Sequence, residues 1–415
     1  MTAVLIVAAF CLSSIVIIEP APFDVVFLLL AAVTVAQANP VLHRDLWLPA
    51  AALAAFALCN AISGMFATDV PLMLLFMAVT FFLILVAVVI FALVATWPEA
   101  THAILIGYCL SSLVSTVITL AVFAGLLPFG VVMFDDSRVQ AFFKDPNVYG
   151  PSLVVSILYL VALLEYRPRW RAGIIVALPT LVLGVVFSAS RAAWMNLAMS
   201  LTLYLGLRAW ESRGRGLGRY WLMAGGVLLL VAGGGVAVAT LTDYGNFMNE
   251  RAAMQDYDAD RFGAQHEGIE RAFEDPLGLG PGQFEPRIGV LGISAHSLYV
   301  RTLLENGLAG LVSVFVFFGL TVLVAFRSAL GGGPLAACGA VVAASLVGVL
   351  FNSAVVDTLH WRSLWIQAGL AWGLYAVCLQ RSTACPSPLA GRVVASGTPT
   401  APLSPLSLTS TGRVD

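Results

Sequence analysis

The sequence predicts an all-α polytopic membrane protein with about twelve transmembrane helices and one long polar loop. Hydrophobic residues make up 60% of the 415 residues and charged residues only 11%, whereas a soluble domain has about 25% charged residues. Apolar runs close to the ~20 residues needed to cross a bilayer recur along the chain. This composition excludes an ordinary soluble enzyme.

The apolar runs define the predicted spans and the organisation of the chain. The spans cover residues 2–18, 23–38, 46–63, 71–96, 102–126, 147–164, 172–190, 192–210, 221–241, 297–326, 334–356 and 361–380. We assign residues 1–241 to helices 1–9, 242–296 to the long loop, 297–381 to helices 10–12 and 382–415 to a tail. The tail is rich in Pro, Ser and Thr, so we expect it to be disordered.

Arginine residues predict the orientation, because basic residues concentrate in cytoplasmic loops. If the N-terminus is inside, the inner side contains the tail arginines and the loop residues Arg44, Arg167, Arg169, Arg171, Arg208, Arg213, Arg215, Arg219 and Arg327. The short outer loops contain few basic residues. We therefore expect both termini in the cytoplasm and the long loop on the outer side, which in a bacterial inner membrane is the periplasm.

The long loop has local order of its own. Asp260 is a candidate cap for a helix over Arg261 to Glu274, which carries Phe262, Ile269 and Phe273 on one side. Such a helix would lie at the membrane interface rather than cross it. Asp275-Pro276 ends this helix, and the glycines of residues 278–282 predict a tight turn. These glycines lack the strand and helix that a nucleotide-binding loop requires.

Several cations lie on the predicted outer side, where the orientation rule disfavours them. Arg138 and Lys144 share one outer loop, Arg191 lies at a hairpin tip and Arg261 lies in the long loop. The last outer hairpin adds Asp357, His360 and Arg362. The arginine fork matches phosphate oxygens in two-point contacts. The pattern indicates an anionic ligand at the outer leaflet.

Other interpretations of these cations stay open. Asp135, Asp136 and Asp145 could neutralise the loop that carries Arg138, which would then be an ordinary solvated loop. The same three carboxylates could hold a divalent cation. Arg191 could extend to lipid headgroups.

His296 ends the long loop at the entrance of a predicted span. A histidine there can accept a proton near neutral pH, which suits a general base; it could also simply end the loop. Arg301 and Glu305 follow it into the span, four residues apart, so they can pair along one helix face. Charges inside a span are costly and indicate a functional site, although a structural ion pair is the alternative.

Three motifs follow one another between residues 138 and 310. They are Arg138-x-x-Ala-x-Phe-x-x-Pro146-Asn147, Ser188-x-Ser-Arg191-Ala-Ala, and Arg261 followed by Pro276-x-Gly-x-Gly280, His296-Ser-x-Tyr299 and Glu305-x-Gly307. In this order and spacing the chain resembles the O-antigen ligase superfamily, which includes O-antigen polymerases and protein O-oligosaccharyltransferases. It departs from the family pattern at Ala141, where glycine is usual, and at Ser297, where asparagine is common.

The resemblance implies a periplasmic-side glycosyltransferase of lipopolysaccharide assembly. It would move a glycan from undecaprenyl diphosphate to a hydroxyl of the lipid A-core, with inversion at the anomeric carbon. An O-antigen polymerase, which uses a lipid-linked glycan as acceptor, is the main alternative. A transporter of lipid-linked glycan is a weaker one, because the halves of the chain show no repeat.

The resemblance also implies roles for individual residues. His296 would be the catalytic base, and Arg138, Lys144, Arg191 and Arg261 would bind the diphosphate. Asn147, Tyr299, Arg301 and Glu305 would support them. We expect membrane lipids as further partners, and no cofactor, bound metal or nucleic acid.

Overall fold

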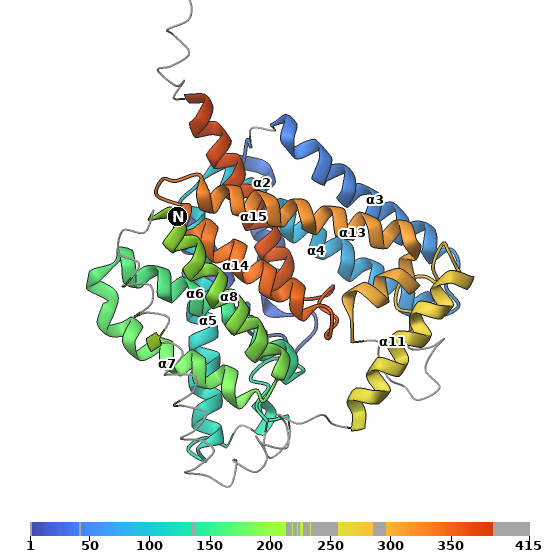
Figure 1. The fold of residues 1–415 in the computed structure, drawn as a ribbon, viewed down its shortest axis with the longest axis horizontal. Coiled ribbons are helices and arrows are strands. Elements are labelled where there is room, and N and C mark those ends of the chain that lie inside the picture. The colour runs from blue at the N-terminus through green and yellow to red at the C-terminus, as the bar shows by residue number, and fades with distance from the viewer. Residues whose placement is uncertain are drawn as a thin grey trace, which may run out of the picture.

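A computed structural model describes residues 2–40, 43–128, 130–134, 138–212, 256–284 and 296–384, with a few single positions between 218 and 233 (Figure 1). This part of the chain is helical. The helices are α1 (Thr2–Phe10), α2 (Pro22–Gln37), α3 (Trp47–Gly64), α4 (Val70–Thr96), α5 (Ala100–Phe123), α6 (Pro146–Tyr166), α7 (Arg171–Phe187), α8 (Arg191–Glu211), α11 (Asp256–Glu274), α13 (Leu298–Leu330), α14 (Ala336–Asn352) and α15 (Arg362–Ala384). Each predicted span contains one of them except 221–241, which lies almost wholly outside the described residues.

The helices indicate a multi-pass membrane protein. Within the described ranges, five helical segments are long and apolar enough to cross a membrane: Arg44–Gly64, Val70–Thr96, Ala100–Phe123, Pro146–Tyr166 and Leu298–Leu330. The helices α2, α7 and α14 are apolar but shorter. Many of their large side chains are exposed, as expected for surfaces that face lipid.

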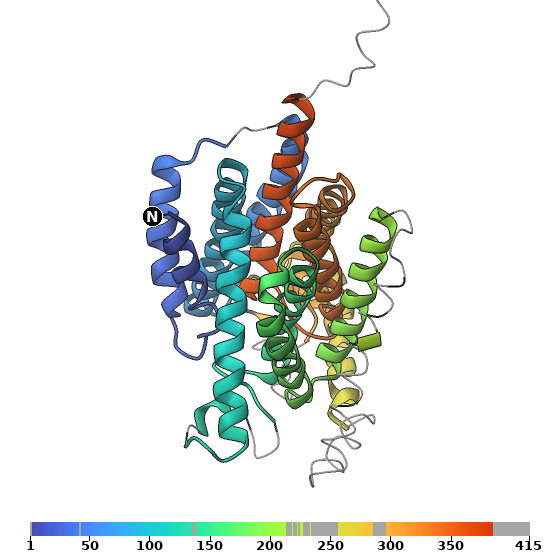
Figure 2. The same cartoon turned by 90° about the vertical axis from the view of Figure 1, so that its left-hand side faces the viewer.

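The helices form one bundle. Helix α3 packs along α13, α4 along α15, and α8 along α14. Figure 2 shows most of them running in a common direction, with α11 near the end of the molecule opposite the C-terminal end of α15. Side chains of α6 and α14 are almost entirely buried, which places these two helices at the centre of the bundle.

The first predicted span was too long. Helix α1 ends at Phe10, and the chain then turns rather than continuing to residue 18. The backbone N–H groups of Val16 and Ile17 both donate to the carbonyl of Phe142, at 2.8 and 2.9 Å. Since these donors bond to the loop that follows Arg138, the helix cannot continue through them.

The predicted helix in the long loop is present as α11, but Asp260 is not its cap, because the helix already includes Asp256. One side of α11 packs on α13 through Gly268 and Ala272. Phe262, Ile269 and Phe273 are exposed on another side. The amphipathic pattern predicted for this segment is therefore confirmed.

Helix α13 is broken at Gly307, whose backbone has φ 70° and ψ −178°. The break leaves two carbonyls of the preceding turn without their usual helical donors. Backbone N–H groups of the glycine loop replace these donors: Leu279 donates to the Leu304 carbonyl at 2.9 Å, and Gly280 donates to the Glu305 carbonyl at 3.0 Å. The glycine loop, residues 275–284, thus completes the broken helix.

Glycine is required on both sides of this contact. A Cβ atom on Gly278 would lie 2.4 Å from the Glu305 carbonyl oxygen, and one on Gly307 would lie 2.3 Å from the Pro276 carbonyl oxygen. Gln283 fixes the other side of the loop, because its Oε1 accepts from the backbone N–H groups of Thr68 and Asp69 at 3.0 Å. The loop is held between α13 and the turn that connects α3 to α4.

Gly307→Ala should lower stability by about 2 kcal/mol or more, because its φ and ψ lie in a region that essentially only glycine adopts, at a cost of ~1–3 kcal/mol to other residues, and the new methyl group meets the glycine loop. Gly319→Ala, later in the same helix, is the matched control. Its Cβ atom would meet nothing within 4 Å, so we expect no loss and a gain of up to ~1 kcal/mol. Thermal unfolding in detergent measures both, and equal stability of the two variants would contradict the prediction.

Candidate active site

Arg138 joins the first two sequence motifs. Its side chain is buried, and its Nη2 donates to Asn147 Oδ1 while its Nε donates to the Ser188 carbonyl, both at 3.4 Å. The guanidinium also lies 5.3 Å from the centre of the Phe134 ring. The arginine predicted to bind the diphosphate and the asparagine predicted to support it are therefore neighbours.

The turn between α7 and α8 places Arg191 beside this group. Ser190 precedes α8, and its hydroxyl accepts from the backbone N–H of Ala193 at 3.4 Å, which is a helix N-cap. Arg191 is the first residue of α8 and is half-buried. Residue Ser188 of the same turn supplies the carbonyl that holds Arg138. The second motif is thus a short, capped turn that brings two arginines to one end of the bundle.

His296 lies immediately before α13 and is half-buried. Burial lowers its pKa below the usual 6.5, and the positive charges of Arg261 and Arg301 lower it further, whereas Asp145 and Asp357 oppose this shift. His296 is thus close enough to these four residues to interact with them electrostatically. The uncharged imidazole that results can accept a proton at neutral pH.

Ser297 caps α13 directly after this histidine. Its hydroxyl accepts from the backbone N–H of Val300 at 3.5 Å and donates to the Ser353 carbonyl at 3.5 Å. Serine and asparagine are about equally good N-caps. Ser297 therefore starts the helix that follows His296 as well as an asparagine would.

Each of the three motifs contains a residue in the left-handed region of backbone conformation. Among the described residues, the non-glycine residues with positive φ are Ala141 (53°), Ala189 (47°) and His296 (44°). This conformation is unfavourable for residues with a side chain and gathers at functional sites. At Ala141 it explains why glycine would suit the position.

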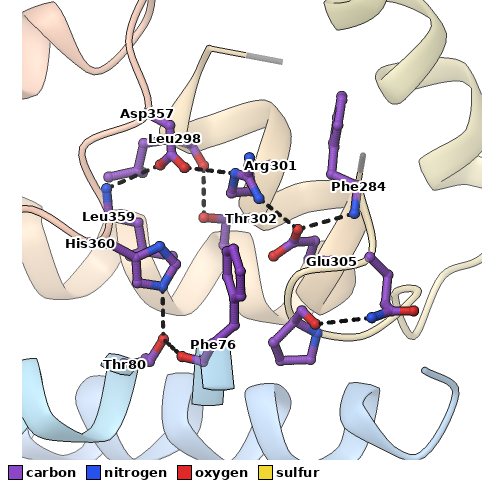
Figure 3. Close-up of polar contacts among 12 residues, drawn as sticks. Phe76, Thr80, Phe284, Leu298, Arg301, Thr302, Glu305, Asp357, Leu359 and His360 are labelled. Carbon is purple, nitrogen blue, oxygen red and sulfur yellow. Dashed lines mark hydrogen bonds and ion pairs between the residues drawn. The ribbon is translucent and has the colours of Figure 1, made fainter. Parts of the chain in front are cut away.

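Arg301 lies at the centre of a buried polar group (Figure 3). Its Nη1 donates to Glu305 Oε1 at 2.9 Å, and its Nε makes an ion pair of 2.6 Å with Asp357 Oδ2. The Nε contact is not aligned as a hydrogen bond, so the attraction there is between charges. The predicted pairing of Arg301 with Glu305 is confirmed, and Asp357 is an additional partner.

Aromatic rings enclose this arginine. The guanidinium lies 5.8 Å from the Phe76 ring centre and 5.7 Å from that of Phe284, within the range of cation–π attraction. The Glu305 carboxylate has a second donor besides Arg301: the backbone N–H of Phe284 donates to Glu305 Oε1 at 3.2 Å. Arg301 and Glu305 are almost fully buried. Their contacts hold α13, the glycine loop and the α14–α15 hairpin together.

Two predicted site residues are turned elsewhere. Lys144 pairs with Glu19 at 2.6 Å in an exposed position and lines a cavity whose walls do not include Arg138. The Tyr299 hydroxyl donates to the Leu350 carbonyl at 2.7 Å, and its ring stacks on Phe315. Tyr299 therefore attaches α13 to α14.

The residues that sequence reasoning missed are those that support the site. Gln283 and Phe284 directly follow the glycine turn, and a polar side chain in that position was the available signal for Gln283. Phe76 lies in the middle of an apolar span, where nothing in the sequence distinguishes it from its neighbours.

The described residues contain no group of three His, Cys, Asp or Glu side chains arranged to hold a metal ion. Asp135 and Asp136, the acidic pair considered for such a site, lie outside them. Comparison with known proteins finds no family model that matches the chain. No curated protein is significantly similar to it in sequence.

The titration of His296 tests this electrostatic arrangement. Its folded-state pKa is lowered, so its ionisation midpoint should lie below 6.5, and its neutral form contributes stability that is lost as the pH falls below that value. Arg261→Gln removes a charge that lowers the pKa and should raise the midpoint. Asp145→Asn removes a charge that raises it and should lower the midpoint.

NMR of histidine-labelled protein measures these midpoints, with His296→Ala to assign the signal. Arg271→Gln is the matched control on α11, since Arg271 pairs with Glu267 on a different side of the helix. It should leave the His296 midpoint unchanged. If Arg261→Gln and Arg271→Gln shift the midpoint equally, Arg261 does not act specifically on His296.

Proposed function

We propose that the chain is a glycosyltransferase of the bacterial inner membrane, an O-antigen ligase, which transfers a glycan from undecaprenyl diphosphate to a lipid A-core hydroxyl. The observation that carries the proposal is that two groups of residues lie at one end of a helical membrane protein. In the first, Arg261 acts on the half-buried His296, whose pKa is lowered. In the second, Arg138 contacts Asn147 and the turn that carries Arg191. A base and several arginines at a membrane surface suit a diphosphate donor.

The proposed topology has twelve spans, a periplasmic loop over residues 242–296 and a disordered cytoplasmic tail. Its support is that the site residues occur at alternate helix ends: before α6, between α7 and α8, before α13, and between α14 and α15. The other helix ends, together with the C-terminal tail, contain most of the arginines, as expected for the cytoplasmic side.

In the proposed reaction His296 removes the proton from the acceptor hydroxyl while its oxygen attacks the anomeric carbon. The new carbon–oxygen bond forms as the bond to the diphosphate breaks, and the electron pair leaves with the diphosphate. Arginines at Arg138, Arg191 and Arg261 would stabilise the charge that develops on this leaving group. Attack from the face opposite the leaving group inverts the anomeric configuration.

In this proposal Arg301 and Glu305 hold the start of α13, and thus His296, in position. Arg301 is surrounded by Glu305, Asp357 and two aromatic rings. The arginines supply positive charge at the leaving group, so the proposed reaction requires no metal ion or cofactor. Lipid A-core, the lipid-linked glycan and membrane lipids are the proposed partners.

Reconstitution tests the function. Purified protein in liposomes, given undecaprenyl diphosphate glycan and lipid A-core, should form glycan-bearing lipid A-core with and without a chelator. Product on a second lipid-linked glycan instead would identify an O-antigen polymerase. Movement of intact donor across the bilayer, with no new glycosidic bond, would identify a transporter.

Variants test the roles of the residues in the same assay. His296→Ala should reduce transfer at least ~100-fold, the lower range for loss of a general base. Arg138→Lys keeps the charge but loses the fork that contacts Asn147 and Ser188, and we expect ~10–100-fold slower transfer. Arg171→Lys, at the start of α7 and the opposite end of the bundle, is the control and should have full activity. Near-normal activity of His296→Ala would remove it as the base.

A further inference from the structure

A cavity of about 170 Å³, with mostly apolar walls and several charged and polar side chains, lies behind the loop that carries Arg138. Its walls come from the α1–α2 connection, α5, the Arg138–Asp145 loop, the start of α6, and the α14–α15 hairpin. Glu19 and Lys144 form its exposed mouth, where their ion pair of 2.6 Å lies in contact with water. Tyr108 and Ser152 lie deeper and are buried. The cavity is thus open to the aqueous end of the bundle.

The cavity shares two walls with the candidate active site. In the first wall Lys144 lines the cavity, whereas the adjacent Asp145 acts on His296. In the second wall His360 lines the cavity, whereas Asp357 contacts Arg301 and acts on His296. His360 also packs against Phe76, the ring beneath Arg301 (Figure 3). A molecule that reacts at His296 could therefore extend a neighbouring group into this cavity.

The charges of the cavity are balanced. Lys144 is paired with Glu19, and Arg362 makes a two-point contact with Asp24, at 2.7 and 2.5 Å. Each cation therefore already has a carboxylate partner, so the cavity offers little net attraction to a phosphate. Carboxylates accept hydrogen bonds from hydroxyl groups, and ammonium and guanidinium groups donate to them. This lining matches a neutral group with many hydroxyls.

The remaining lining matches a sugar ring. Phe143, Trp361 and Tyr108 supply aromatic surface, and Ser152 and Ser363 add hydroxyls. Small-molecule sites combine such apolar walls with a few placed polar groups. The volume is below the ~300 Å³ at which drug-sized sites begin, so a single ring fits the cavity better than an oligosaccharide does.

We propose that this cavity binds one neutral sugar ring of the glycan that reacts at His296. The inference rests on the proposed function for the identity of the molecule to which the ring belongs. Binding of the ring itself requires neither the lipid diphosphate nor the catalytic histidine.

Saturation-transfer NMR with methyl glucoside and methyl N-acetylglucosaminide tests the proposal. The protein is held in phospholipid nanodiscs, because maltoside detergents would themselves supply sugar. We expect saturation to pass from the protein to the ring protons of at least one of the two glycosides. Ser363→Leu, which fills the cavity, should abolish this signal. Ser313→Leu is the matched control on α13, where the serine bonds only to its own helix at Ala309, and should keep the signal.

A second variant keeps the test valid if Ser363→Leu fails to fold. Glu19→Ala changes an exposed side chain at the mouth and should weaken glycoside binding about 10-fold, as expected for loss of a hydrogen bond to a charged group, with unchanged thermal unfolding. Absence of signal from both glycosides, or equal signals in wild type, Ser363→Leu and Glu19→Ala, would overturn the proposal. Displacement of a bound glycoside by inorganic phosphate would overturn the proposal that the cavity binds a neutral group.

The two proposals can fail separately. His296→Ala should bind the glycosides as wild type does, since the histidine is outside the cavity. Glycoside binding without transfer activity in liposomes would contradict the proposed function and leave the cavity assignment intact. Transfer activity without glycoside binding would contradict the cavity assignment and leave the proposed function intact.

Discussion

A buried arginine is the constraint on which the rest of the site depends. A guanidinium removed from water is strongly destabilising unless nearby groups replace its hydration. For Arg301, the groups that replace hydration are Glu305 on its own helix, Asp357 in the α14–α15 hairpin, and the rings of Phe76 and Phe284. These groups come from α13, the hairpin, α4 and the glycine loop, so one charge fixes the relative positions of four parts of the chain. His296 lies at the start of the helix that they fix.

The same arrangement sets the chemistry of the histidine. Burial and two neighbouring arginines disfavour the imidazolium, while Asp145 and Asp357 favour it. Burial and the two arginines outweigh the two carboxylates, so the imidazole is neutral. A positive charge at Arg261 would stabilise an anionic leaving group and would also help to keep the base unprotonated. In the proposed reaction Arg261 is the arginine that has both roles.

The helices could be predicted from the sequence because burial in lipid requires long apolar runs, and the predicted spans fall on helices from α1 to α8 and from α13 to α15. The pairing of Arg301 with Glu305 followed from helical spacing. The partner Asp357 did not, because it depends on how two hairpins pack. Nor did the different surroundings of Arg138 and Lys144, which lie six residues apart in one loop; between them lies Ala141, with the unusual φ of 53°.

The break at Gly307 also divides α13 into a short segment that follows His296 and a longer membrane helix. Residues 308–330 alone exceed the ~20 residues that cross a bilayer. The preceding turns, which start beside His296, are bonded instead to the glycine loop through Leu279 and Gly280. A long membrane helix tilts when the thickness of the bilayer changes. Because the helical hydrogen-bond ladder is interrupted at Gly307, we expect this helix to tilt without rotating the segment next to His296, so that the geometry of the site would not depend on the thickness of the surrounding lipid.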